Sequence, residues 1–340
     1  MKNKKPNTIR KILAIRGMGA ALSAFVGLII IYIAFGLINP EVFSGQNILN
    51  LLRSMSKYLL IGIAQSYVLI TGNIDLSIGT MVGMSSMISA TLMSNGVTPI
   101  VAISVSLGAC LATGVVNGCL VGKFKLPPFI ATLGTMFVTR GVAYMVNGNR
   151  NTSSISSGIG KEAGDAFQNF FYYGTTFGIY NTFWIALIIF AIFFFILSKT
   201  RTGRHIYAIG SNIDAAKLSG VNVVATTTKV YIVSAICSWM VGLILCAQAC
   251  MGNMEAGNMY EMYGVAAGVI GGVSPLGGTG ILLGTFGGAA VWQTLENGLN
   301  MIGAQVGIQR LVIGIIVVAA VLLDVVVRSG EFGKKKEKHN

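Results

Sequence analysis

The sequence predicts an all-α, polytopic integral membrane protein of about ten transmembrane segments. Hydrophobic residues make up 54% of the chain and charged residues only 10%. A soluble domain normally carries about a quarter charged residues. The mean hydropathy is +0.73. Long apolar runs recur along the whole chain and are separated by short polar turns, a pattern typical of a protein that crosses a bilayer repeatedly.

The apolar runs can be compared with the roughly 20 residues that a straight helix needs to cross a bilayer. They lie near residues 17–38, 56–71, 75–94, 98–121, 128–147, 178–198, 229–250, 262–273, 281–300 and 308–327. The second and eighth runs are too short for a straight span and end in glycine-rich turns, so we expect them to be broken, tilted or re-entrant. The first run lacks a signal-peptide cleavage motif, which favours a retained anchor.

The basic residues indicate which segments face the cytoplasm. Of the 24 lysines and arginines, 18 fall in residues 1–16, 123–125, 199–229 and 328–340, and short basic flanks mark the cytoplasmic side of a span. We therefore expect one transmembrane domain over residues 1–340, with a basic arm, a loop and a basic tail inside, both termini cytoplasmic, and residues 149–179 outside. The net charge of +13 is not gathered on a soluble domain, which argues against a nucleic-acid partner.

A weak internal repeat accompanies this topology. Residues 70–76 and 270–276 match at the isoleucine, the second glycine position and the leucine, and each stretch ends a short apolar run. The charge pattern places both stretches on the inside. Segments two to five and seven to ten are therefore interpreted as duplicated units with the same orientation, as in some transporters.

Glycine is unusually frequent, with 44 residues. Small residues let helices approach closely in lipid, and helix packing explains most of these glycines. Residues 271–280 differ, because their glycines bracket Pro275 and a continuous helix cannot pass through them. Irregular backbone at membrane depth is tolerated only beside protein or a water-filled cavity, which suggests a pore or gate element.

Missing motifs exclude several classes of protein. The chain has no G-x-x-x-x-G-K-[ST] sequence, so it cannot hold ATP in a P-loop of its own. Its two histidines, His205 and His339, cannot supply a metalloprotease site. Its five cysteines form no C-x-x-C pair and are interpreted as small packing residues. We expect no catalytic residue, no metal site and no cofactor bound by this chain.

Charged residues within the apolar runs are costly and often functional. Asp75 and Asp324 fall near the ends of segments, where they can be solvated or cap a helix, and Arg140 and Glu296 lie deeper. The deeper pair has two interpretations, a structural ion pair with snorkelling or the lining of a polar translocation path. No span carries the cluster of carboxylates typical of a proton relay.

The loop 199–229 contains the signals of a short helix over Ile213–Ser219. Asn212 suits the N-cap, Asp214 the first turn, Lys217 the last turn and Gly220 the C′ position. Ile213, Ala216 and Leu218 would then form a small apolar surface, and the small Ala215 and Ala216 would fit a shallow groove of a soluble partner. A helix lying on the membrane surface is the alternative.

Four segments in order, residues 72–79, 128–136, 200–220 and 266–274, resemble the permease subunits of ribose-type bacterial ABC sugar importers. The resemblance covers nearly the whole chain. Two departures are Asn73, where the family usually has glycine, and the pair Pro275-Leu276 after the Gly-Gly-x-Ser stretch.

This resemblance implies a permease in the bacterial cytoplasmic membrane that imports a monosaccharide or similar solute. A separate ATP-binding ABC subunit, which holds ATP and Mg, would dock on the loop 199–229, an extracytoplasmic sugar-binding protein would dock outside, and a second permease copy or a close paralogue would complete the pore. An ion-coupled secondary transporter is the alternative. The coupling-loop candidates are Thr202, Gly203, Arg204, Tyr207, Ala208, Gly210, Asn212, Asp214, Ala215, Ala216 and Gly220. The pore or gate candidates are Gly72, Asn73, Asp75, Ser77, Gly134, Thr135, Gly271, Gly272, Ser274, Gly277, Gly278 and Gly280.

Overall fold

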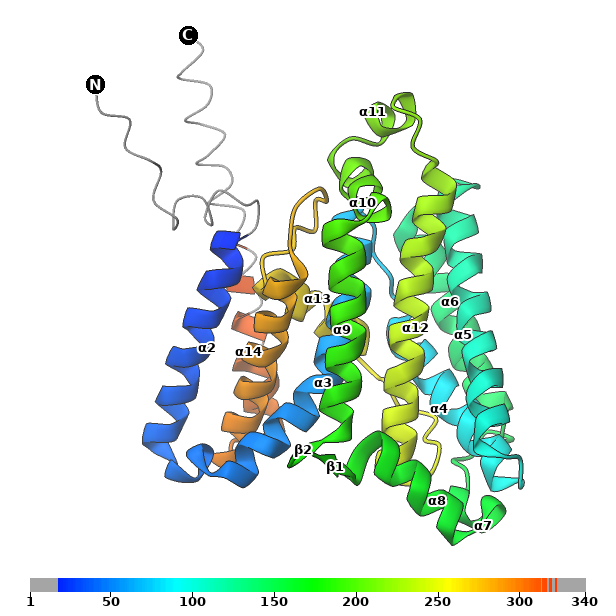
Figure 1. Ribbon diagram of the computed structural model, residues 1–340, viewed down its shortest axis with the longest axis vertical. Coiled ribbons are helices and arrows are strands. Elements are labelled where there is room, and N and C mark those ends of the chain that lie inside the picture. The colour runs from blue at the N-terminus through cyan, green and yellow to red at the C-terminus, as the bar shows by residue number, and fades with distance from the viewer. Residues whose placement is uncertain (1–17, 313, 317, 320–321, 323–340) are drawn as a thin grey trace.

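The computed structural model describes residues 18–312, 314–316, 318–319 and 322, and these residues are almost entirely helical (Figure 1). The longer helices are α2 (Met18–Ile38), α3 (Gly45–Ile70), α4 (Ile78–Ser94), α5 (Pro99–Gly122), α6 (Pro128–Met145), α9 (Asn181–Lys199), α12 (Val223–Ala249), α13 (Tyr260–Ile270) and α14 (Leu282–Met301). The shorter elements are η1 (Pro40–Phe43), α7 (Ile155–Ile159), α8 (Lys161–Gln168), the π-helical η2 (Asn169–Tyr173), β1 (Thr175–Thr176), β2 (Ile179–Tyr180), α10 (Arg201–Ser211) and α11 (Ile213–Leu218). The basic arm 1–16 and the basic tail 328–340 lie outside the described residues, and the last expected span, 308–327, with Asp324, is described only in part.

The helices form a bundle with two distinct ends. In Figure 1, α10 and α11 lie at one end, and α7, α8 and the β1–β2 hairpin lie at the other. The turn after α5 shares the end of α10 and α11, because the end of α5 packs on the start of α12. A side chain at Gly118 would collide with Thr228, and one at Gly122 would be crowded by Val224. The expected grouping of the 123–125 turn with the loop 199–229, opposite the segment 149–179, is confirmed.

Four of the described helices are long and apolar enough to cross a membrane: α2, α5, α9 and α12. Their surroundings differ, since 72% of the apolar window of α12 is buried against 17–28% in the other three. α12 is therefore central, and α2, α5 and α9 expose apolar side chains of the kind that face lipid. The other expected spans that are described are helical as well.

The expectation of a short or broken second segment at 56–71 is wrong. α3 is one continuous helix of 26 residues, about 39 Å long at 1.5 Å per residue. It begins at the Ser44 N-cap, whose Oγ accepts from the Asn47 amide at 3.3 Å. The polar side chains of Asn50 and Arg53 lower the hydropathy of its first half, so the sequence pattern did not identify this half as part of the helix. The expected tilt is present, because α3 runs obliquely across the bundle (Figure 1).

The eighth segment is short, as expected. α13 has 11 residues, or about 16 Å, too few to cross a hydrocarbon core of about 30 Å. The irregular segment 271–281 follows it and leads into α14.

α3 and α13 end in the same motif, which supports the internal repeat. The amide of Gly72 donates to Leu69 O at 2.8 Å and that of Asn73 to Val68 O at 3.2 Å. At positions exactly 200 residues later, Gly272 donates to Val269 O at 2.8 Å and Val273 to Gly268 O at 2.9 Å. Both glycines have positive φ, +74° and +82°, which is the Schellman ending that favours glycine at C′.

The boundaries expected for the repeat are wrong by one segment. The shared motif makes α13 the equivalent of α3 and α14 the equivalent of α4, so the second segment corresponds to the eighth, not to the seventh. The packing agrees with this alignment if α12 is the equivalent of α2. In one unit α2 packs on α14, and in the equivalent contact α12 packs on α4. The repeat therefore compares α2–α4 with α12–α14.

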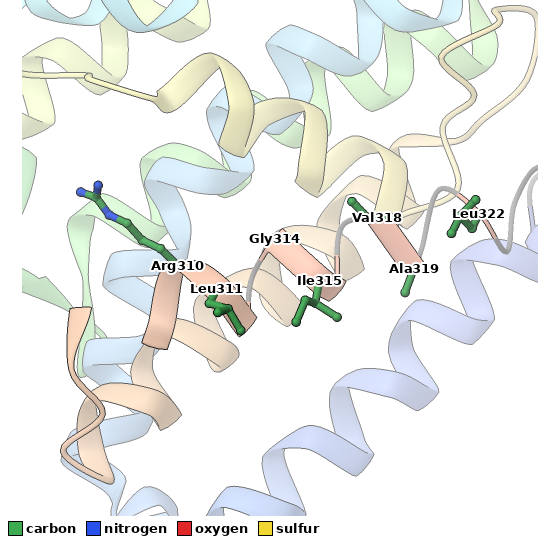
Figure 2. A pocket seen from close by; sticks show the side chains of 7 residues that line it. All are labelled: Arg310, Leu311, Gly314, Ile315, Val318, Ala319 and Leu322. Carbon is green, nitrogen blue, oxygen red and sulfur yellow. The ribbon is translucent and has the colours of Figure 1, made fainter. Parts of the chain in front are cut away.

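The five cysteines are free, and Cys110, Cys237 and Cys246 are buried, as expected of packing residues. At the surface, the described part of the C-terminal helix presents one face with a shallow apolar hollow. Figure 2 shows its lining side chains, which recur at helical spacing: Arg310, Leu311, Gly314, Ile315, Val318, Ala319 and Leu322. Exposed aliphatic side chains at this spacing are typical of a face toward lipid or another helix.

Candidate functional site

The polar loop 199–229 folds into two helices, and the sequence predicted only the second. α10 begins at Thr200, whose Oγ1 accepts from the Gly203 amide at 3.4 Å. Gly203, Ile206 and Ile209 are its buried residues, and a side chain at Gly203 would collide with the carbonyl of Leu197 at the end of α9. Two features of the sequence could have predicted α10: the three-residue spacing of these buried positions and the threonine that precedes them.

α11 has the caps that the sequence predicted. Asn212 Oδ1 accepts from the Ala215 amide at 2.9 Å. At the other end, the Gly220 amide donates to Lys217 O at 3.0 Å and the Val221 amide to Ala216 O at 3.1 Å, and Gly220 has a φ of +81°. The helix over Ile213–Ser219 is thus confirmed, with Ser219 as its C-cap.

The apolar surface expected on α11 needs a correction. Ala216 is only 4% exposed, because it faces the rest of the chain and not a partner. Leu218, by contrast, is 89% exposed and Ile213 50% exposed. The free apolar surface of α11 is therefore formed by Ile213 and Leu218, beside the exposed Ala215.

The exposed part of this end is predominantly basic. Arg201, Arg204 and Lys217 are exposed, with Asp214 as an exposed acid on the same two helices. Thr202, Tyr207, Ala208 and Gly210 are half-buried, and Asn212 is exposed. Burial raises the pKa of Tyr207 to about 12, so its hydroxyl stays protonated and donates to Gly280 O at 2.6 Å.

Beneath α10, three segments that are far apart in sequence meet. The amide of Gly278 donates to Ile70 O at 2.8 Å, joining the segment 271–281 to the end of α3. A side chain at Gly210 would collide with Ile70 O and with the Gly278 amide, and one at Gly277 would crowd Gly210 and Gly72. We call this contact of α10 with residues 70–72 and 277–280 the junction. The sequence predicted the coupling-loop candidates and the pore candidates in separate sites. At the junction, Gly210 of the first set contacts Gly277 and Gly278 of the second.

Four of the pore or gate candidates, Gly72, Gly277, Gly278 and Gly280, lie under α10 at one end of the bundle. All four have positive φ, a backbone conformation that favours glycine. Ser274 shapes the same segment, because its amide donates to Thr279 O at 3.1 Å and its Oγ accepts from the Leu276 amide at 3.2 Å. The segment turns outward at its tip, where Leu276 is 83% exposed.

Gly271 and Gly272 lie at the other end of this segment, where α13 stops. Gly271 packs against the backbone of Gly284 on α14, with no room for a side chain on either. These glycines allow close helix contact and helix termination, which is the packing role expected for most glycines of the chain.

Asp75 holds the turn between α3 and α4 in place. It is fully buried, and its Oδ1 accepts from the amide and hydroxyl of Ser77 at 2.9 and 2.6 Å. Its Oδ2 accepts from the hydroxyl of Ser234 on α12 at 2.7 Å. Asn117 donates to Ser77 Oγ at 2.9 Å, and Thr135 donates to Asn117 Oδ1 at 2.7 Å.

This network joins α4, α5, α6 and α12, so Asp75, Ser77 and Thr135 are buried structural partners and do not line an open passage in this conformation. Its members Asn117 and Ser234 were not predicted, since nothing in their sequence spacing links them to Asp75. Two other pore candidates are exposed or half-buried: Gly134 is exposed with open space around it, and Asn73 donates to Thr71 Oγ1 at 2.9 Å.

The two deep charges do not pair with each other. Arg140 donates to the carbonyls of Met254 and Ala256, and Glu296 accepts from the Tyr58 hydroxyl at 2.6 Å. No group of three or more His, Cys, Asp or Glu residues within the described part of the chain could hold a metal ion. The site at the junction is an exposed two-helix platform in backbone contact with the end of α3 and with residues 277–280.

Comparison with known proteins places the chain among transport permeases. Residues 47–321 match the family described as branched-chain amino acid transport system / permease component. The chain is 38% identical to the ribose import permease protein RbsC of Bacillus subtilis, over 95% of this chain and 98% of the relative. It is 34% identical to the D-allose transport system permease protein AlsC of Escherichia coli and 33% identical to the galactose/methyl galactoside import permease protein MglC of Salmonella typhimurium, in each case over 88% of this chain and 90% of the relative. No solved structure gives a significant match.

Proposed function

Because the chain belongs to the family of branched-chain amino acid transport system permease components, we propose that it is the membrane-spanning permease of an ATP-driven importer of a monosaccharide or similar polyol-like solute. The relatives carry the names of ribose, allose and galactose permeases, which favours a sugar over an amino acid. The family description names a component of a transport system, which favours a multi-subunit importer over a single-chain, ion-coupled transporter.

One structural observation carries the mechanism. The α10–α11 platform presents Leu218, Ile213 and Arg204 outward, while its inner side touches the ends of α3 and of the segment 271–281. A partner that draws this platform sideways would move the end of α3 and the segment that leads into α14 together. The permease thereby converts ATP-driven closure of a soluble subunit into rearrangement of its helices, and it needs no catalytic group or cofactor of its own.

The proposed assembly follows the two ends of the bundle. The ATP-binding ABC subunit, with its ATP and Mg, docks on α10 and α11 in the cytoplasm. An extracytoplasmic sugar-binding protein docks near the segment 149–180 at the opposite end. A second copy of the permease or a close paralogue completes the pore, with ten spans per chain, both termini cytoplasmic, in the bacterial cytoplasmic membrane.

The function is tested by reconstitution. Proteoliposomes that contain the permease, its ATP-binding subunit and its binding protein are expected to take up radiolabelled D-ribose, D-allose or D-galactose only with ATP, and vanadate should abolish the uptake. Proton or sodium gradients imposed without ATP serve as the control. Uptake driven by such a gradient, and insensitive to vanadate, would assign the chain to the ion-coupled class.

The orientation is tested by cysteine labelling. In a variant without the five native cysteines, Ser157→Cys lies in the exposed part of the segment 149–180 and Ser211→Cys at the exposed end of α10. A membrane-impermeant maleimide should label Ser157→Cys in intact cells and Ser211→Cys only after permeabilisation, because charged reagents do not cross the bilayer. The reverse pattern would invert the proposed topology.

A further inference from the structure

Midway along α3, aromatic residues from three helices surround one buried tyrosine. Tyr58 of α3 is 5% exposed, and its ring centroid lies 5.8 Å from Tyr263, 6.2 Å from Tyr260 and 6.3 Å from Trp292. Tyr263 and Trp292 approach to 5.0 Å. Tyr260 and Tyr263 of α13 stay partly exposed above the buried rings. We call these four side chains the aromatic cluster.

Charged groups border the aromatic cluster. Glu296 of α14 accepts from the Tyr58 hydroxyl at 2.6 Å through one oxygen, and the carboxylate remains partly exposed. Five residues before Tyr58, the Arg53 guanidinium lies 4.6 Å from the ring centroid of Tyr172 and 4.1 Å from that of Tyr180, both in the segment that follows α8. A cation held over aromatic faces is fixed in direction.

Several polar atoms of the same helices lack hydrogen-bond partners among the described residues. They are Arg53 Nε, Gln293 Oε1 and both amide atoms of Gln65. Gln65 is fully buried and lies two turns from Tyr58 on the same face of α3, where its Cβ faces Gly264 of α13. Gln293 precedes Glu296 by one turn on α14. An unpaired buried amide costs free energy, so these groups are suited to a ligand that brings its own hydroxyl groups.

We propose that the aromatic cluster with Arg53, Gln293 and Glu296 is a saccharide-contact site of the permease, within the helical bundle. The inference rests on the proposed function. A sugar ring has apolar C–H faces that pack on aromatic rings and a rim of hydroxyl groups that both donate and accept. A carboxylate accepts, a guanidinium donates and an amide does both, while aromatic walls with a few oriented polar groups are the usual make-up of a small-molecule site.

Polar side chains also lie along α3 between the aromatic cluster and the junction. Along α3, Gln65 is followed by Ser66, whose hydroxyl lies 2.7 Å from that of Thr285 on α14. Four residues later α3 ends at Ile70, which contacts Gly278 and Gly210. The helix that carries Tyr58 near its middle is thus the helix whose C-terminal end α10 touches, so ATP-driven movement of α10 would alter the sugar-contact site.

A purely structural role is the competing explanation, in which the cluster only ties α3, α13 and α14 together. The two roles differ in one measurable respect, since only a contact site binds free sugar. Saturation-transfer difference NMR on the solubilised permease–ATPase complex detects weak binding of this kind. The probes are D-ribose, D-allose and D-galactose, with L-leucine as the counter-probe because of the family's description.

We expect at least one of the three sugars, and not L-leucine, to receive saturation from the wild-type complex. Glu296→Gln, which keeps size and shape, and Tyr263→Leu, at a partly exposed ring, should each reduce that signal at least fivefold. Trp184→Leu is the matched control, because Trp184 is an aromatic residue of α9 that lies outside the cluster. A thermal-melting measurement on each complex checks that the variants are folded.

Three results would overturn the proposal: no signal from any sugar with the wild-type complex, unchanged signals in both folded variants, or a signal from L-leucine alone. If Tyr263→Leu does not fold, Glu296→Gln decides. ATP-dependent uptake by the wild-type importer is measured in parallel. Uptake without a sugar signal would refute the proposed contact site but would still support the importer function. Absence of uptake would count against the importer function itself.

Discussion

Replacing Leu218 with glutamate is expected to release the ATP-binding subunit while leaving the permease folded. Leu218 is 89% exposed at the tip of α11, so the substitution removes no internal contact. Burying a leucine side chain in a partner contributes about 2 kcal/mol, and a carboxylate without a counter-charge at the same place adds a desolvation cost. At about 1.4 kcal/mol per tenfold change, affinity should fall by roughly 30-fold or more.

Co-purification of the ATP-binding subunit with the Leu218→Glu permease measures this loss, and Leu218→Met, which keeps an apolar side chain, should retain the complex. Ala216→Glu is an informative contrast, because Ala216 is buried within the permease and glutamate there should lower the thermal stability of the permease itself. A Leu218→Glu permease that retains its ATP-binding subunit in detergent would instead favour the alternative of a helix on the membrane surface.

The sequence was most informative where a signal is local. The caps of α11 at Asn212 and Gly220 follow from hydrogen bonds within a few residues, and they are present as predicted. The termination of α13 follows in the same way from glycines in sequence. Composition was sufficient for the membrane class, since so low a charge content leaves few alternatives.

Prediction was wrong where tertiary contacts override the local pattern. The first half of α3 carries Arg53, which packs on Tyr172 and Tyr180, and Asn50, which accepts a hydrogen bond from Arg53. Because these residues are polar, hydropathy alone placed the start of the helix 11 residues too late. Ala216 looked like part of a docking surface because its residue type is small, but small residues also mark close packing within the chain. The junction brings together residues near positions 70, 210 and 278. Contacts between residues so far apart in the sequence cannot be predicted from local residue spacing.

The internal repeat is a second case in which the sequence pattern alone was insufficient. The glycines at 72 and 272 were correctly matched, yet the segments around them were grouped with the wrong boundaries. The identical Schellman hydrogen bonds fix the alignment, because they specify which residue of each helix is equivalent. A repeat that has diverged in side chains is therefore recognised more reliably by backbone geometry than by sequence identity.

The junction gives the last prediction, that Gly210→Ala separates ATP hydrolysis from transport. The Cβ of alanine would overlap the carbonyl oxygen of Ile70 and crowd the Gly278 amide, so α10 must shift away from α3. Overpacking of this kind costs typically about 1–3 kcal/mol, which a large bundle tolerates. The substitution leaves the exposed side chains of Leu218 and Arg204 in place on the platform, and the ATP-binding subunit should still dock.

We therefore expect Gly210→Ala to reduce ATP-dependent uptake at least tenfold, while the complex keeps its basal ATP hydrolysis and loses its stimulation by the loaded binding protein. Proteoliposomes with the complete importer allow both rates to be measured on one sample. Gly108→Ala in α5 is the control, because a side chain there meets no neighbouring atom within 4 Å. Full uptake with Gly210→Ala would mean that movement does not pass from α10 to α3 at this contact, and the mechanical role of the junction would have to be abandoned.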